Sequence, residues 1–176
     1  MTSKLKENLF KNKSIFGLIG LCIVISIISP RFLSVANLRN VFTQISVNAV
    51  IAMGMTFVIL TGGIDLSVGS IVAISGALSA SLIKSTGSIW IGLLSAVLIG
   101  AVVGLINGLV ISKGKLQAFI ATLATQTIFR GITYVFTGGN PISGLTDELI
   151  ILANSRILGI PVLVIVTIIV LIICAY

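Results

Sequence analysis

The chain has 176 residues, of which 57% are hydrophobic and only 9% are charged, with a formal net charge of +7. Soluble domains average about 25% charged residues, so this chain has too few charges for a water-exposed shell. It also contains no histidine, the commonest general base and metal ligand, which argues against a hydrolase or a metalloenzyme. We therefore expect a membrane protein without a catalytic residue, a metal site or a cofactor.

The basic residues are distributed as topology signals, so nucleic acid is not expected as a partner. Four lysines lie between Lys4 and Lys13, ahead of the first apolar stretch, and lysines beside a span favour the cytoplasmic side. We expect residues 1–13 to form a cytoplasmic N-terminus and residues 14–176 to form a transmembrane domain in contact with lipid. Ser14 to Ile28 could instead be a secretory signal peptide, but the membrane-like sequence beyond it favours an uncleaved span.

About six apolar stretches predict an all-α fold, a polytopic bundle of transmembrane helices. The predicted helices cover Ser14 to Ile28, Val41 to Leu60, Ser70 to Ile83, Ile89 to Ile111 and Ala118 to Phe136, and a sixth begins at Ile157. The third stretch is short for a span, and it can extend back through residues 62–67 or forward past Lys84.

Counting the crossings gives a topology that the basic residues support. With the N-terminus inside, the loop from Gly138 to Arg156 lies outside after five crossings, whereas Lys113 and Lys115 lie inside after four, as the positive-inside rule prefers. The sixth stretch then returns inward and ends at Tyr176 without a polar tail. Because polar residues usually follow the last helix, we expect a chain truncated at its C-terminus.

The segment from Thr61 to Ser70 places two glycines and a carboxylate between two apolar stretches. Gly62 and Gly63 let one helix end, and Asp65 or Ser67 can cap the next helix and place negative charge near its positive end. A carboxylate within a membrane is also costly, and is by default a functional candidate. These four residues are candidates for a helix break or for gating, and capping is favoured over a direct role in substrate passage.

Small residues repeat every four positions in the fourth stretch, at Gly100, Gly104 and Gly108. Such a stripe forms a groove that a neighbouring backbone can approach closely, so we expect these glycines to mediate helix packing.

Two polar lines are candidates for a translocation path. Gln44 and Asn48 share one helix face, and Thr122, Gln126 and Arg130 share another. Neutral amides and hydroxyls suit an uncharged polyhydroxy substrate. Interhelical hydrogen bonding uses the same groups and is the favoured alternative, and Arg130 can also snorkel to the outer surface.

Several linked segments from about Val41 onward occur in an order and spacing typical of one family. They are Ile59 to Ser70, Asn107-Gly108, Lys113-Gly114-Lys115, Phe119 to Leu123, Phe129-Arg130-Gly131, and Thr137-Gly138-Gly139 with Pro141-Ile142. Together they resemble the bacterial ribose-type ABC sugar permeases.

The resemblance implies a multi-pass permease of the bacterial plasma membrane, the subunit of an ATP-driven importer that translocates a ribose-like or related monosaccharide. It further implies a second permease copy, separate cytoplasmic ATPase subunits and an extracytoplasmic sugar-binding protein. The outer loop at residues 138–156 resembles the region of the family that contacts this binding protein. The family's cytoplasmic coupling segment would follow the point where this chain stops. The alternative is therefore a truncated membrane interaction or assembly half without transport activity. A secondary transporter ranks third, because Asp65 is the only carboxylate within the apolar stretches.

Overall fold

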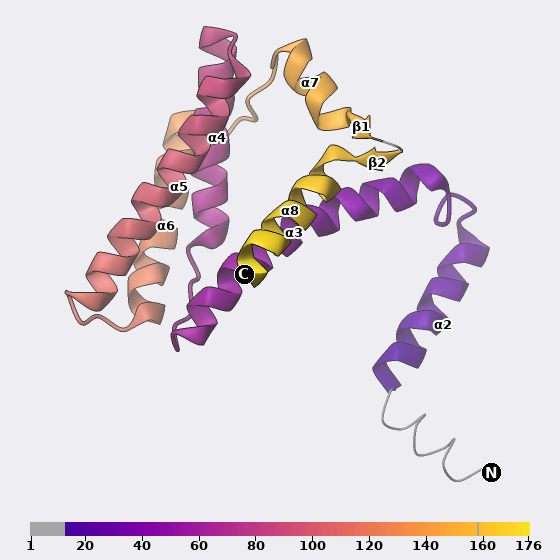
Figure 1. The fold of residues 1–176 in the computed structure, drawn as a ribbon, viewed down its shortest axis with the longest axis horizontal. Coiled ribbons are helices and arrows are strands. Elements are labelled where there is room, and N and C mark those ends of the chain that lie inside the picture. The colour runs from indigo at the N-terminus through magenta and orange to yellow at the C-terminus, as the bar shows by residue number, and fades with distance from the viewer. Residues whose placement is uncertain (1–12, 158) are drawn as a thin grey trace. The chain divides into compact units, whose positions relative to one another are not determined.

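The computed structural model describes residues 13–157 and 159–176 of the chain (Figure 1). The chain divides into two compact units, Met1–Ile45 and Ser46–Tyr176. Apart from the backbone of Lys13, the predicted basic N-terminus lies outside the described residues.

The first unit contains helix α2 (Lys13–Ile28) and the beginning of helix α3 (Val35–Leu60). Helix α2 ends two residues before Pro30, because a residue that precedes proline avoids the helical conformation. Helix α3 begins six residues before the predicted Val41. Its first turn is capped by Ser34, whose Oγ accepts a hydrogen bond from the Asn37 N–H at 3.2 Å.

The second unit holds the rest of α3 and all later elements. These are α4 (Val68–Thr86), α5 (Ile89–Ser112), α6 (Ala118–Thr137), α7 (Asp147–Asn154), β1 (Arg156–Ile157), β2 (Ile160–Pro161) and α8 (Val162–Ala175). The predicted all-α helix bundle is confirmed, because helices cover each of the apolar stretches. Among the described residues, α3, α4 and α5 are long and apolar enough to cross a membrane, and α2 and α8 are shorter apolar helices. The count of six spans is therefore approximate.

Two further predicted helices have other boundaries in the structure. The third stretch continues past Lys84 to Thr86 and does not extend back through the glycine-containing break. The sixth helix begins at Val162 and not at Ile157. The antiparallel strands β1 and β2 precede it, with Ile157 paired to Ile160, so the residues before Pro161 are held in an extended conformation.

Helices α4, α5 and α6 pack together (Figure 1). Helices α4 and α5 are antiparallel, and they lie in close contact at Gly92 near the start of α5. A Cβ placed on Gly92 would lie 2.2 Å from Ile83 Cγ1 and 3.1 Å from the Ser79 carbonyl oxygen. Only glycine therefore allows the two backbones to lie this close.

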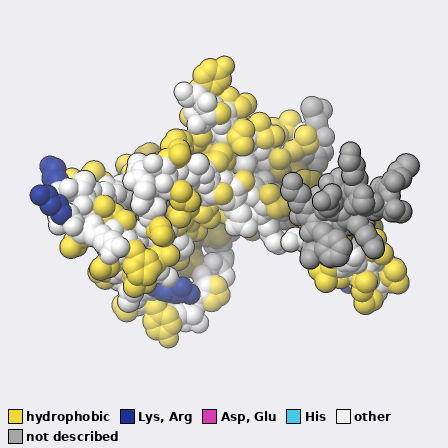
Figure 2. Space-filling view, turned by 90° about the horizontal axis from the view of Figure 1, so that it is seen from below, with side chains coloured by type: hydrophobic (Ala, Val, Ile, Leu, Met, Phe, Trp, Pro, Cys, Tyr) yellow, Lys and Arg dark blue, Asp and Glu magenta, His cyan; other side chains and the backbone are white. Residues whose placement is uncertain are grey.

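Most of the long apolar side chains point outward. The buried apolar residues among the described part of the chain are Ile74, Ile83, Val103 and Ala121. Figure 2 shows apolar side chains over much of the visible surface, with few basic ones. Lipid tails solvate such a surface. Among the described residues, the buried side chains include more polar than apolar ones, and the polar ones are Ser46, Ser67, Ser70, Ser79, Asn107 and Thr122.

Candidate functional site

The break between α3 and α4 begins with a glycine turn. The Gly63 N–H donates to the Val58 carbonyl at 3.0 Å, and the Gly62 N–H donates to the Ile59 carbonyl at 2.9 Å. This pair of bonds is a Schellman motif, which needs a left-handed residue just past the helix. Gly62 meets that need with a φ of +77°.

Asp65 organises the backbone just ahead of α4. Its Oδ1 accepts hydrogen bonds from the Ser67 N–H at 2.7 Å and from the Ser67 hydroxyl at 2.5 Å. Ser67 occupies the N-cap position of α4 but makes no side-chain capping bond. The prediction was that Asp65 or Ser67 caps this helix. The Ser67 hydroxyl is turned toward Asp65 and makes no capping bond, whereas Asp65 accepts a hydrogen bond from the Ser67 N–H.

The hydrogen bonds continue from Ser67 into the other two helices. Asn107 of α5 donates from Nδ2 to Ser67 Oγ at 2.9 Å, and Thr125 of α6 donates from Oγ1 to Asn107 Oδ1 at 2.6 Å. We call Asp65, Ser67, Asn107 and Thr125 the polar junction. Ser67 is 0% exposed and Asn107 is 5% exposed. These buried groups are tolerated in an apolar protein because each is hydrogen-bonded.

Thr122 makes a second hydrogen-bonded contact between the break and α6, in addition to that through Thr125. Its hydroxyl accepts a hydrogen bond from the Leu66 N–H at 3.2 Å and donates to the Ala118 carbonyl at 2.8 Å. Thr122 is 1% exposed. The Leu66 N–H lies outside any helix and therefore has no hydrogen bond within a helix. A side chain of the neighbouring helix α6 accepts its hydrogen bond instead, as burial in an apolar medium requires.

A cavity of about 620 Å³, which we call the junction cavity, lies beside the polar junction. Its lining includes Asp65, Asn107, Thr122, Gly62 and Gly63 from the break and its partners, and Gly104 and Gly108 from α5.

The predicted packing role of the glycine stripe has no counterpart inside the described part of the chain. A Cβ placed on Gly100, Gly104 or Gly108 would meet no atom within 4 Å. Two of the three glycines face the junction cavity instead. Close packing at this stripe stays a prediction that requires a partner from outside the described residues.

The residues predicted for a translocation path do not share one cavity. Thr122 lines the junction cavity, whereas Arg130 lines a second cavity of about 450 Å³. Gln126 is half-buried and Asn48 is exposed, and neither lines these two cavities. Gln44 is exposed on α3 in the first unit. The roles of all five residues in transport remain predictions.

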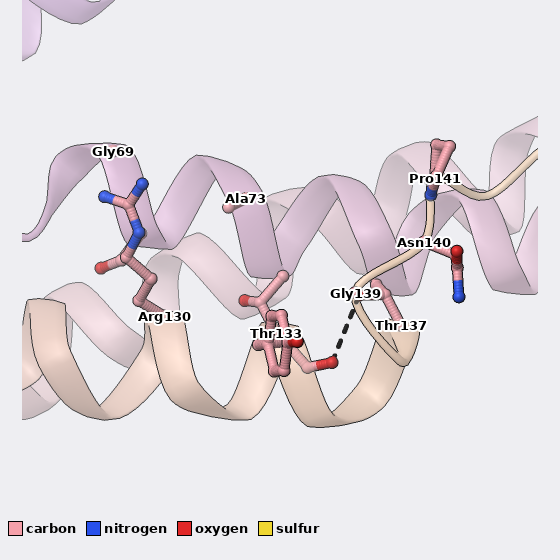
Figure 3. Close-up of a pocket in the computed structure, with 10 residues that line it drawn as sticks. Gly69, Ala73, Arg130, Thr133, Thr137, Gly139, Asn140 and Pro141 are labelled. Carbon is pink, nitrogen blue, oxygen red and sulfur yellow. Dashed lines mark hydrogen bonds between the residues drawn. The ribbon is translucent and has the colours of Figure 1, made fainter.

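The second cavity lies between α4 and α6 and is shown in Figure 3. We call it the polar cavity. Its lining consists of Gly69, Ser70, Ala73, Arg130, Thr133, Tyr134, Thr137, Gly139, Asn140 and Pro141. Sequence reasoning grouped Arg130 with residues four apart and missed Thr133 and Thr137. Their offsets of three and seven from Arg130 place them on the same helix face, and this was the signal available.

The bundle of α4, α5 and α6 has two chemically distinct ends. The polar junction and the end of α5, just before Lys113 and Lys115, lie together around the junction cavity. At the other end, Lys84 Nζ donates to the Ser143 carbonyl at 2.9 Å. There the α4–α5 turn and Glu148 of α7 line a common pocket.

Comparison with known proteins identifies the family. Residues 37–176 match the family described as "branched-chain amino acid transport system / permease component", which is a family of transport permeases and not of enzymes. No solved structure matches the chain significantly.

The curated relatives include several sugar permeases. The ribose import permease protein of Haemophilus influenzae is 48% identical over 158 residues, 88% of this chain and 49% of the relative. The ribose import permease protein of Bacillus subtilis is 50% identical over 148 residues, which cover 83% of this chain and 46% of the relative. The D-allose transport system permease protein of Escherichia coli is 39% identical over 155 residues, which cover 85% of this chain and 48% of the relative. The chain thus spans about half the length of these relatives.

The family and the apolar helices together confirm the expected multi-pass location in the bacterial plasma membrane. The chain therefore belongs to the branched-chain amino acid transport system / permease component family, and the predicted resemblance to ribose-type ABC permeases is confirmed.

Proposed function

We propose that the chain acts as the membrane-spanning permease of an ATP-driven importer for a monosaccharide. An extracytoplasmic binding protein delivers the sugar, two permease copies form the route, and separate cytoplasmic subunits hydrolyse ATP. The observation that carries the proposal is the place of the segment Ile59 to Ser70. This segment resembles the ribose-type permeases, and here it forms the break and the polar junction that joins three helices.

The proposed chemistry is translocation without bond breaking, so the chain needs helices that move as units. The polar junction suits this task because one chain of hydrogen bonds links the start of α4 to α5 and α6. We expect these three helices to move together, with Asp65 serving as scaffold. Gating or direct contact with sugar at Gly62, Gly63, Asp65 or Ser67 is the less favoured role.

The chemistry of the cavities favours a neutral substrate over an amino acid. A zwitterionic ligand is best held by paired charges, a cation for its carboxylate and an anion for its ammonium group. Among the described residues that line the polar cavity, Arg130 is the only charged one, and Asp65 Oδ1 in the junction cavity is already bonded to Ser67. Hydroxyl and amide groups make up the remaining polar lining, which suits a polyhydroxy compound.

We further propose that the junction end of the bundle faces the cytoplasm. Lys113 and Lys115 follow α5 at this end, and short loops rich in lysine are retained inside. The loop after α6 and helix α7 then face outward, where the binding protein would dock.

The test is uptake of labelled pentoses, hexoses and leucine in cells that carry the complete operon, with the permease gene deleted and then restored. We expect restoration to recover uptake of one or more monosaccharides and to leave leucine uptake unchanged. Recovery of leucine uptake alone would contradict the proposal. An abundant membrane protein that restores no uptake would favour the alternative of an assembly half.

A further inference from the structure

The polar cavity has an unusual lining for this protein. Although 57% of the chain is hydrophobic, the lining contains no valine, leucine, isoleucine, methionine or phenylalanine, and its aliphatic members are Ala73 and Pro141. For comparison, a cavity beside α8 is lined chiefly by valine, isoleucine and leucine. Lipid tails or an apolar helix would fit the latter cavity, whereas the polar cavity is suited to a ligand that makes hydrogen bonds.

Two hydroxyl groups of the lining, those of Ser70 and Thr133, use their protons on the backbone. Ser70 donates from Oγ to the Ser67 carbonyl at 2.8 Å, and Thr133 donates from Oγ1 to the Phe129 carbonyl at 2.7 Å. Each hydroxyl oxygen keeps lone pairs that can accept hydrogen bonds. Toward a ligand, these two side chains are therefore acceptors.

The other polar groups of the lining include Asn140, Arg130 and the Tyr134 hydroxyl, which can donate or accept a hydrogen bond. Asn140 donates from Nδ2 to the Gly138 carbonyl at 3.0 Å, which leaves its Oδ1 as an acceptor. Arg130 supplies a fork of donors and no acceptor. Figure 3 shows its side chain extending from α6 toward Gly69 of α4. The lining of the cavity thus contains several acceptors and the donor cluster of Arg130.

An aromatic ring borders the same cavity. Gly139 has a φ of +72°, and a Cβ placed on it would lie 2.9 Å from Tyr134 Cε2. Glycine at this position therefore lets the Tyr134 ring lie against the loop that follows α6, where Asn140 and Pro141 are also found (Figure 3).

We propose that the polar cavity is a binding site for a neutral monosaccharide in the permease itself. A sugar hydroxyl both donates and accepts, so a sugar can donate to Ser70, Thr133 and Asn140 and accept from Arg130. An inorganic anion such as phosphate is chiefly an acceptor, with only one or two O–H groups, so most of its oxygens would meet the lone pairs of the first three residues. The cavity volume of about 450 Å³ lies within the range of small-molecule sites.

The proposal rests on the proposed function and makes it more specific. The cavity begins next to the polar junction, at Gly69 and Ser70, and follows α6 toward the loop after Thr137. In the proposed topology that loop lies on the outer side, so a sugar would occupy the polar cavity before it reaches the junction cavity.

The experiment is ligand-observed saturation-transfer NMR on the full-length permease in detergent, without its ATPase and binding protein. D-ribose is the probe and inorganic phosphate is the competitor. Thr133→Val removes one acceptor and is compared with Thr127→Val. Thr127 is a matched control on α6, since its exposed hydroxyl also donates to the carbonyl four residues back, at 3.0 Å, and lies outside the cavity lining.

We expect D-ribose to bind the wild type and Thr127→Val alike, and Thr133→Val to weaken binding by about fivefold, the effect of one hydrogen bond. Arg130→Gln should weaken binding similarly, whereas Arg156→Gln, at an exposed position outside the lining, should not. If Thr133→Val does not fold, Asn140→Ala tests the same prediction in an exposed loop.

Absence of ribose binding to the wild type, equal affinities for the two threonine variants, or displacement of ribose by phosphate would each overturn the proposal. The same preparations are then reconstituted with the ATPase and binding protein. Sugar transport without binding at this cavity would refute the site and leave the proposed function intact, whereas transport of no monosaccharide would refute the function.

Discussion

Asn107 Nδ2 donates a hydrogen bond of 2.9 Å to Ser67 Oγ, a residue 40 positions earlier in the chain. Both side chains are buried. Because Ser67 in turn donates to Asp65 and Asn107 accepts from Thr125, this one contact connects the break before α4 to both of the helices that pack against it.

Replacing Asn107 by leucine should lower stability. The change removes the hydrogen bonds of Asn107 to Ser67 and Thr125 but leaves the bonds of those hydroxyls to Asp65 and to the Ala121 carbonyl, so we expect a loss of about 1–2 kcal/mol. Thermal unfolding of the full-length permease in detergent measures the effect. Asn48→Leu removes an exposed amide from α3 and is the control. Equal melting temperatures for the two variants would show that the polar junction adds nothing to stability.

Asp65 tests whether charge or hydrogen-bond geometry matters at the break. Asparagine keeps an acceptor for the Ser67 N–H but loses the charge, whereas leucine loses both. In the full-length permease, we expect Asp65→Leu to lower membrane abundance most, and Asp65→Asn to transport at an appreciable rate per molecule. A fully abundant Asp65→Asn protein without uptake would instead assign the carboxylate to the transport mechanism.

Two of the four glycines on α5, Gly92 and Gly104, should respond differently to alanine. Gly92→Ala places a Cβ against Ile83, which is 2% exposed, so we expect a loss of about 1–3 kcal/mol from overpacking. Gly104→Ala meets no atom within 4 Å and should be neutral or slightly stabilising through helix propensity. Thermal unfolding of the two variants measures these differences in stability.

A double variant checks the cause of the Gly92 effect. Adding Ile83→Ala removes the side-chain atoms that the new Cβ would meet, so the double variant should lose less than the sum of the single losses. Additive losses of stability would show that the contact with Ile83 is not the cause of the Gly92→Ala effect. A large loss for Gly104→Ala would mean that a partner from outside the described chain covers the stripe, as the spacing of Gly100, Gly104 and Gly108 predicts.

The sequence predicted the helices well because long apolar stretches have few other solutions in a membrane. It also identified the break at Gly62 and Gly63, whose conformation only local residues determine. It did not predict strands β1 and β2, because the apolar stretch from Ile157 onward reads like a helix until Gly159 and Pro161 are given weight. Nor did it predict helix α7, which is only 8 residues long.

The site was less predictable than the helices, because its contacts join residues far apart in the chain. From the sequence, Asn107 was named only within the segment Asn107-Gly108, and Thr125 was missed, since a polar face drawn through Thr122 and Gln126 passes beside that residue. Which of two polar residues on one helix turns inward depends on the neighbouring helix, and the spacing of residues in a single sequence does not carry that information.

Cysteine labelling tests the proposed topology. Cys22 and Cys174 are first replaced by serine, and single cysteines are then introduced at Lys113 and at Asp147. Because these positions lie toward opposite ends of the bundle, an impermeant maleimide added outside the cell should label the cysteine at 147 and not the one at 113. Equal labelling of both from outside would show that the crossing count is wrong.

The central claim, that the permease imports a monosaccharide at the expense of ATP, is tested most directly in proteoliposomes. The full-length permease is reconstituted with its ATPase subunits, binding protein is supplied on the outer face, and accumulation of labelled D-ribose, D-allose, L-arabinose and L-leucine is measured with and without ATP inside. We predict ATP-dependent accumulation of at least one sugar and none of leucine. Accumulation of leucine without any sugar would contradict the account.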